Sequence, residues 1–188
     1  MSSNVWNAID VQAVEANPHS LQNRLMRVAW AAVACLLFRP SPNPFFRFRI
    51  LLLRIFGADV DWSAHPYPKC RIWAPWNLKM GPNSCLANYV DCYNPARIEL
   101  CELAIVSQYT YLCTASHDYN HPGFTHFSRP ITIESYAWVA ARAYIGPGVT
   151  VANGAVVGAN ACVYKSVPAW AVVGGNPARV IGHREIHK

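Results

Sequence analysis

The chain has 188 residues, of which 53% are apolar and only 14% are charged. This length suits a single domain with its own core, and the composition excludes a disordered chain, which combines low hydrophobicity with high charge. The net charge of +6 is concentrated at the ends: residues 1–58 hold six arginines against two acidic residues, and residues 142–188 hold five basic residues against one. A basic end can meet a phosphate, a nucleic acid or an anionic membrane, or can serve solubility alone.

Neither membrane insertion nor secretion is expected from the sequence. The longest apolar run covers residues 28–38, whereas a membrane-spanning helix needs about 20 residues, and the first 20 residues lack the pattern of a signal peptide. The seven cysteines are an odd number and form no CxxC pair, which favours small buried thiols in a reducing compartment over disulfides or structural zinc. We therefore expect a cytoplasmic protein.

Residues 1–59 are predicted to be an N-terminal helical segment. Two stretches in it, 21–38 and 45–56, have helix-like sequences, and the connector RPSPNP between them breaks the helix with prolines at alternate positions. One interpretation is that both helices cover an open end of the structure that follows. A second and compatible interpretation is peripheral contact with the inner face of the membrane through residues 20–56, where arginines interleave with phenylalanine and leucine.

From Ile133 onward the sequence repeats every six residues, which is typical of a parallel β-helix. The first position of each hexad is β-branched and aliphatic, in Ile133, Val139, Ile145, Val151, Val157 and Val163. The fifth position is small, in Ala137, Ala143, Val149, Ala155, Ala161 and Val167. Three hexads make one triangular coil, with the aliphatic side chain inside the prism and the small residue near a tight corner.

The same register returns upstream with more noise, in two blocks that begin at Met80 and Leu100. Their fifth positions are Ser84, Val90, Ala96, Ala104, Thr110 and Ser116. The coils are expected at about 60–79, 80–97, 100–117, 133–150 and 151–168. Glycines directly after an aliphatic position are expected to relieve corner strain, at Gly81, Gly146 and Gly158. The predicted fold class is an all-β main body, a parallel β-helix over residues 60–188 with a C-terminal cap at 169–188.

Between residues 118 and 131 the pattern lapses into DYNHPGFTHFSRPI, whose prolines and glycine cannot continue a regular strand. We expect a loop extruded from a corner, and such loops are disproportionately functional. His117 stands where the coil gives way to this loop. Its imidazole can take a proton from a hydroxyl near neutral pH, although a lone histidine is more often structural or simply exposed.

Four stretches of the sequence are distinctive: APWNLKMGP, YLCTASHDY, AWVAARAYIGPGVTVANGAVVGANACVYKSVP and VVGGNPARVIG. Together they resemble the hexapeptide-repeat acetyltransferases, above all the colanic-acid-type polysaccharide O-acetyltransferases, which are related to the maltose and galactoside acetyltransferases. The resemblance covers about residues 40–183. It implies a left-handed β-helix, a homotrimer with active sites between subunits, and transfer of an acetyl group from acetyl-CoA to a carbohydrate hydroxyl in the assembly of a surface polysaccharide or its oligosaccharide precursor.

By this resemblance His117 is the general base, and no metal is required. The resemblance implies contacts to acetyl-CoA from Trp138, Ala141, Ala159, Lys165, Gly175, Asn176, Pro177 and Arg179. Contacts to the acceptor carbohydrate are expected from Asp91, Asn94, Asp118 and Tyr119. Plainer roles are open for each: Trp138 can pack against a neighbouring subunit, and Lys165 can be a solvated charge.

Three alternatives stay open at this point. A γ-carbonic-anhydrase-like metal enzyme on the same fold would draw on His117, His121 and His126. A ping-pong mechanism would use Cys113 as the nucleophile, four residues before His117. A β-helix scaffold without catalysis is the third. No nucleic-acid partner is expected, because the basic and aromatic stretches contain no recognised nucleic-acid-binding motif.

Overall fold

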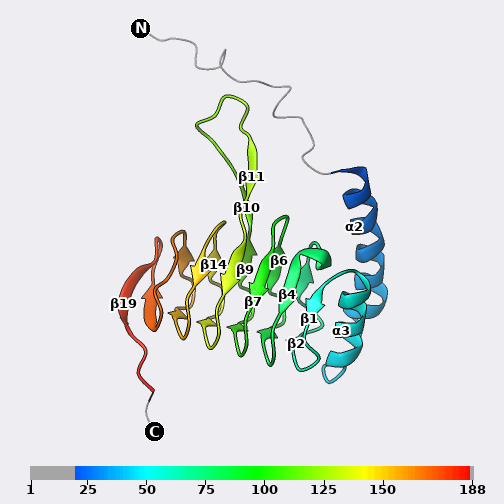
Figure 1. The fold of residues 1–188 in the computed structure, drawn as a ribbon, viewed down its shortest axis with the longest axis horizontal. Helices are drawn as coiled ribbons and strands as arrows, with labels where there is room; N and C mark the ends of the chain where they lie inside the picture. Colours follow the sequence, from blue (N-terminus) through cyan, green and yellow to red (C-terminus); the bar gives the residue numbers. More distant parts are fainter. Residues whose placement is uncertain (1–19, 187–188) are drawn as a thin grey trace.

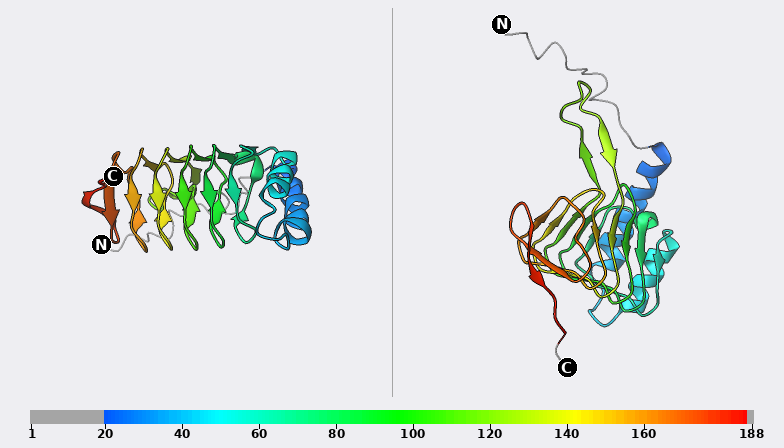
Figure 2. Two further views of the ribbon diagram at one scale, coloured as in Figure 1. Left: turned by 90° about the horizontal axis from the view of Figure 1, so that it is seen from below. Right: turned by 60° about the vertical axis from the view of Figure 1, so that its left-hand side comes forward.

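The computed structural model describes residues 20–186, which form a left-handed parallel β-helix with helices at one end (Figure 1). Short strands joined by tight turns wind round a prism, and successive coils stack in a row along its axis (Figure 2). The predicted fold class is confirmed. The five coils begin with strands at Asp59, Leu78, Ile98, Ile131 and Thr150.

Three sheets form the walls of the prism. Wall A consists of β1 (Asp59–Val60), β4 (Leu78–Met80), β7 (Ile98–Leu100), β12 (Ile131–Ile133) and β15 (Thr150–Val151). Wall B consists of β2 (His65–Pro66), β5 (Cys85–Leu86), β8 (Ile105–Val106), β13 (Trp138–Val139), β16 (Val156–Val157), β18 (Ala171–Gly174) and the antiparallel β19 (Arg179–His183). Wall C consists of β3 (Arg71–Ile72), β6 (Asp91–Tyr93), β9 (Tyr111–Cys113), β14 (Tyr144–Ile145) and β17 (Cys162–Val163).

The remaining elements lie outside the three walls. Before the first coil come α2 (Leu21–Val33), the π-helical η2 (Ala34–Phe38) and α3 (Phe46–Ile55). A short 3-10 turn, η3 (Pro75–Asn77), lies between the first two coils. Between the third and fourth coils, β10 (Ala115–His117) pairs with β11 (His126–Ser128) in a hairpin.

The hexad pattern predicts the core of the prism correctly. All six aliphatic positions from Ile133 to Val163 are 1% exposed or less, and such burial stabilises by about 1.5–3 kcal/mol per side chain. The fifth positions over the same stretch are buried as well. Upstream, Ala96 is partly buried and Ser116 is exposed, because the chain leaves the regular coil at these two corners.

The corners use a backbone conformation that the sequence does not reveal. The residue three positions after the aliphatic one adopts a left-handed φ even where it carries a large side chain, as in Leu103 (55°) and Tyr136 (61°). Gly81 and Gly158 serve close approach instead of a positive φ. A Cβ atom on Gly81 would lie 3.0 Å from the backbone nitrogen of Glu102 on the next coil, so these corners need the space that glycine leaves.

The N-terminal helices cover the end of the prism at the first coil. Ile50 and Leu53 of α3 are fully buried in the same core cluster as Val60, and the indole N–H of Trp30 on α2 donates to the carbonyl of Ile72 at 2.7 Å. Among residues 20–186, no helix combines the length and the hydropathy that a membrane span requires.

The buried Arg49 of α3 fastens the connector between the helices to the first coil. Its Nε donates to the carbonyl of Pro66 at 2.7 Å, while its terminal nitrogens donate to the hydroxyl of Ser41 and the carbonyls of Pro42 and Asn43 at 2.6–2.9 Å. Burial lowers the pKa of Arg49. Because one guanidinium satisfies four oxygens, the proline-rich connector has a fixed path across the end of the prism.

Candidate active site

The segment that interrupts the hexads is a β-hairpin of residues 115–128, which we call the arm. Its strands pair antiparallel, so that His117 lies opposite His126. At the base, the backbone N–H of Arg129 donates to the carbonyl of Thr114 at 2.8 Å. The arm leaves the prism at the corner between walls C and A and stands clear of it (Figures 1 and 2).

His117 is exposed on the arm, and aromatic rings hold it from two directions. Its imidazole stacks on the ring of Phe124, with a centroid distance of 4.6 Å and an interplanar angle of 8°. The ring of His126 lies 5.4 Å away and meets it edge-on. Burial, with a smaller contribution from His117, lowers the pKa of His126. His117 therefore presents its imidazole to solvent in a defined orientation, as a general base requires.

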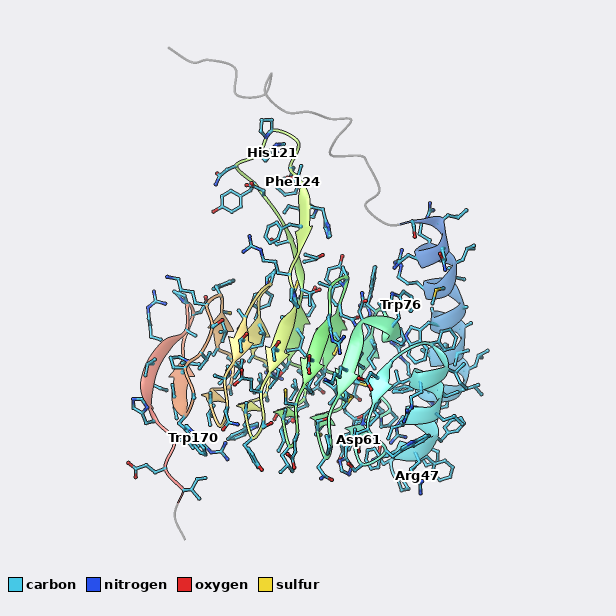
Figure 3. All side chains as sticks on the ribbon, viewed as in Figure 1. Arg47, Asp61, Trp76, His121, Phe124 and Trp170 are labelled. Atoms are coloured by element: carbon cyan, nitrogen blue, oxygen red, sulfur yellow. The ribbon has the colours of Figure 1, made fainter. Side chains whose placement is uncertain are left out.

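The two predicted acceptor residues after His117 belong to the end of the arm, where Figure 3 labels His121 and Phe124. The carboxylate of Asp118 accepts the backbone N–H of Asn120 at 3.0 Å, which is a local turn contact. Tyr119 is 80% exposed. Within one chain, both residues stand apart from the prism on which Asp91 lies.

Asp91 and Asn94, the other predicted acceptor contacts, behave differently from each other. Asp91 faces out of wall C and pairs with Arg71, whose Nη1 lies 3.3 Å from Oδ2. Burial raises the pKa of Asp91, against the opposing effect of Arg71 and Arg39. Asn94 is fully buried, and its amide bonds both backbone groups of Ala74, at 2.9 and 2.8 Å. In this arrangement the amide of Asn94 is enclosed and joins two neighbouring coils.

The thiol of Cys113 is enclosed by the wall. It donates to the carbonyl of Ala115, with sulfur and oxygen 3.1 Å apart, and the side chain is 7% exposed. Burial and the contact with Cys113 raise the pKa of the phenols of Tyr111 and Tyr144. No base within hydrogen-bond reach is seen to activate this thiol in the described structure, so the geometry disfavours Cys113 as a nucleophile.

A pocket of about 530 Å³ at the C-terminal end of the prism brings together several predicted acetyl-CoA contacts. Lys165, Pro177 and Arg179 line it. Gly175 and Asn176 are exposed in the same turn, and Gly175 has a φ of 93°, which favours glycine. Neither Lys165 nor Arg179 forms an ion pair in the described part of the chain, so both positive charges are available to a phosphate.

The other three predicted acetyl-CoA contacts lie elsewhere. Trp138 faces out of wall B, 44% exposed, and its indole N–H donates to the hydroxyl of Ser107 at 2.9 Å. It lines a largely apolar pocket of about 380 Å³ together with Ile105. Ala141 and Ala159 lie at the corner between walls B and C, where the carbonyl of Ala141 accepts the N–H of Asn160 on the next coil at 3.0 Å.

A single chain therefore does not bring the candidate base and Trp138 together. The arm leaves the corner between walls C and A, whereas Trp138 projects from wall B, which is the wall opposite that corner. A site that uses both must include a second copy of the chain.

The contacts of two candidate side chains were not predicted from the sequence: Phe124 stacks on His117, and Ser107 accepts the indole N–H of Trp138. The hairpin of the arm could have been predicted from the sequence, because His121, Pro122 and Gly123 form a turn sequence at its centre. Reading that turn as the end of a hairpin would have placed His117 on the strand that faces His126 and Phe127. In residues 20–186, no cluster of three or more histidine, cysteine, aspartate or glutamate side chains is arranged to hold a metal ion.

Comparisons with known proteins agree with this architecture. The chain is 39% identical over 155 residues to the "Putative colanic acid biosynthesis acetyltransferase WcaF" of Escherichia coli (strain K12), which is 82% of this chain and 85% of that protein. It is 43% identical over 61 residues to the galactoside O-acetyltransferase of the same organism, 32% of this chain and 29% of that protein. No family model matches the chain.

Among solved structures, the hexapeptide-repeat acetyltransferase VCA0836 of Vibrio cholerae, complexed with acetyl-CoA, superposes with a TM-score of 0.76 at 26% identity. The match covers 90% of this chain and 93% of that one. Fold and relatives together define an acetyltransferase of the hexapeptide-repeat class. Within that class the chain belongs to the family of WcaF, as the sequence motifs predicted.

Proposed function

We propose that the protein transfers an acetyl group from acetyl-CoA to a hydroxyl of a carbohydrate, with His117 as the general base. The observation that carries the proposal is the exposed imidazole of His117, held against Phe124 on an arm beside an otherwise regular prism. Acetyl-CoA as donor is supported by its presence in the Vibrio cholerae structure. A carbohydrate acceptor is supported by the names of the relatives, which include a galactoside O-acetyltransferase and an enzyme of colanic acid biosynthesis.

In this mechanism His117 moves one proton twice. The imidazole takes the proton from the acceptor hydroxyl while the hydroxyl oxygen attacks the thioester carbonyl carbon. The new bond joins that oxygen to the acetyl carbon, the carbon–sulfur bond breaks, and His117 returns the proton to the departing sulfur. Lys165 and Arg179 bind the phosphates of the donor, and exposed backbone around Gly175 allows its nucleotide end to approach.

The test separates chemistry from binding. A mass-spectrometric screen of glycan acceptors with acetyl-CoA identifies the substrate. His117→Ala is expected to lower turnover by about 10²- to 10⁴-fold, the usual contribution of a general base, while acetyl-CoA binding is retained. Normal turnover by this variant would overturn the assignment.

The proposed enzyme is a homotrimer with its active sites between subunits. The difference between the walls supports contact between subunits through wall B. Wall A carries outward charges such as the Lys79–Glu99 pair at 2.8 Å, whereas wall B exposes the apolar side chains of Ile105 and Trp138. Light scattering on the purified protein measures the assembly. Coexpressing His117→Ala chains with Trp138→Ala chains tests the shared site: mixed trimers recover activity if the two residues come from different subunits, and stay inactive if each site uses one chain.

We further propose that the protein is cytoplasmic and touches the inner face of the membrane through residues 20–56. The outward face of α2 and η2 is apolar, since Leu21, Leu25, Val28 and Leu36 are 62–72% exposed. On α3, Ile55 is 68% exposed on the face opposite the buried one. Residues 20–58 contain six arginines, of which Arg49 is buried, and no acidic residue, so the remaining charge complements an anionic bilayer.

Cosedimentation with vesicles tests this contact. The wild type is expected to bind vesicles that contain anionic lipid and to bind zwitterionic vesicles more weakly. The double variant Leu25→Glu/Ile55→Glu should lose the binding. The matched control is Ile181→Glu, because Ile181 is 69% exposed on β19 at the other end of the prism. Equal binding by all three proteins would contradict the proposal.

A further inference from the structure

A second cationic pocket, of about 260 Å³, lies between α2 and wall C, at the end of the prism opposite the proposed donor site. Three arginines line it, Arg27 and Arg39 from the helical side and Arg71 from β3, together with Trp30 and Trp73. We call it the arginine pocket. Figure 1 shows α2 standing beside this end of the prism.

The pocket is built from fixed parts. The guanidinium of Arg27 lies 4.3 Å from the centre of the Trp73 ring, and its Nε donates to the amide oxygen of Asn23 at 3.1 Å. The bond from the Trp30 indole to the Ile72 carbonyl holds α2 against β3. The position of the Arg27 guanidinium therefore depends on packing against Trp73 and on its bond to Asn23.

The charge in the pocket is not balanced by its own surroundings. Arg71 pairs with Asp91, but neither Arg27 nor Arg39 has an ion-pair partner in the part of the chain that the structure describes. Three guanidinium groups against one carboxylate leave an excess of two positive charges around a partly enclosed space. Guanidinium groups match the geometry of phosphate oxygens, and an excess of this size suits a phosphate or diphosphate.

The pocket lies on the same wall as the base of the arm. Arg71 is in register with Asp91, and Asp91 with Tyr111, on three neighbouring strands that are about 4.8 Å apart. The β9 strand that holds Tyr111 leads directly into the arm. Between the pocket and β9, the rings of Trp73 and Tyr93 meet at 5.5 Å and form an aromatic surface on which a sugar ring can rest.

We propose that the arginine pocket binds the phosphate or diphosphate group of the acceptor, so that the acceptor is a sugar attached to phosphate and not a free saccharide. This rests on the proposed function. An anion held by Arg27, Arg39 and Arg71 directs the attached sugar along wall C toward the arm. The carrier of the phosphate is a nucleoside or a polyprenyl lipid, and both present the same group to the pocket.

The first experiment measures binding without catalysis. Inorganic pyrophosphate is titrated calorimetrically into the full-length protein. The wild type should bind it, and Arg39→Gln and Arg71→Gln should each weaken binding by about 10-fold or more, as expected for lost charge-assisted hydrogen bonds. Arg47→Gln is the matched control, because Arg47 is an exposed arginine of α3 outside the pocket. No binding by the wild type, or equal losses in all three variants, would overturn the proposal.

The second experiment distinguishes the carriers and separates this inference from the proposed function. Acetyl transfer is compared for one sugar as the free saccharide, as its nucleoside diphosphate derivative and as its polyprenyl diphosphate derivative. A phosphate-linked form should be preferred, and pyrophosphate should compete with it. Acetylation of the free sugar at the same rate, without inhibition by pyrophosphate, refutes the inference while the proposed function stands. Pyrophosphate binding without acetylation of any carbohydrate refutes the proposed function instead.

Discussion

Removing the ring of Phe124 tests whether the arm orients His117 or merely carries it. The two rings stack at 4.6 Å, and an aromatic pair of this kind contributes about 0.5–1.5 kcal/mol beyond its burial. Because about 1.36 kcal/mol corresponds to a tenfold change, loss of the pair should reduce the productive orientation of His117, and with it kcat, by roughly 2- to 13-fold. Phe124 belongs to the arm and not to the proposed donor pockets, so the KM for acetyl-CoA should stay the same.

The assay is acetyl-CoA-dependent release of free thiol at saturating acceptor, for wild type, Phe124→Ala, Phe124→Tyr and His117→Ala. Tyrosine keeps the stacked ring, so Phe124→Tyr should restore kcat to near the wild-type value. The reasoning fails if Phe124→Ala is fully active. It also fails if Phe124→Ala is as impaired as His117→Ala, or if tyrosine does not rescue, because each result would mean that stacking is not the contribution of this ring.

Three further predictions concern stability. Gly154→Ala should lower the melting temperature by several degrees, because the new Cβ would lie 2.8 Å from the Trp170 ring and the residue has a φ of 66°. Gly182→Ala is the control: no atom lies within 4 Å of its Cβ, so calorimetry should show a nearly unchanged melting temperature. The pKa of His126 is lower in the folded arm, so the unfolded arm binds protons more readily and arm stability should fall as pH drops through about 6.5. Amide exchange of β10 and β11 between pH 7.5 and 5.5 measures this change. A His126→Phe variant should lack the effect. Arg49→Met should destabilise by about 1–3 kcal/mol in urea unfolding, because it leaves the buried carbonyl of Pro66 unpaired. An unchanged free energy of unfolding would show that water replaces the guanidinium.

The sequence predicts the prism well because each hexad is a local unit. In a three-sided coil, an aliphatic residue at every sixth position points into the prism, so the buried positions from Ile133 to Val163 follow directly from the periodicity. The corners were harder to predict. Left-handed φ values at Leu103 and Tyr136 are imposed by the stacking of coils on both sides, and neither residue type signals such a backbone.

The candidate site was predictable only in part. His117 could be found because it ends a hexad beside a break in the pattern, but its contact with Phe124 depends on the hairpin register. Asn94 looked like a polar surface residue, and only the structure shows that its amide joins two coils. The arginine pocket could not be predicted from the sequence, because its lining comes from helical residues 27–39 and strand residues near 71. These residues are distant in the chain and meet only when α2 packs on wall C.

The closed base of the arm has a consequence for the stability of the core. Ile98 and Leu100 pair with Ile131 and Ile133 in an unbroken parallel register, although the whole arm is inserted between them. The stacked core is therefore indifferent to what the inserted segment contains, provided that Thr114 and Arg129 still meet. Changes in the length or sequence of the arm should therefore cost the stacked core little stability.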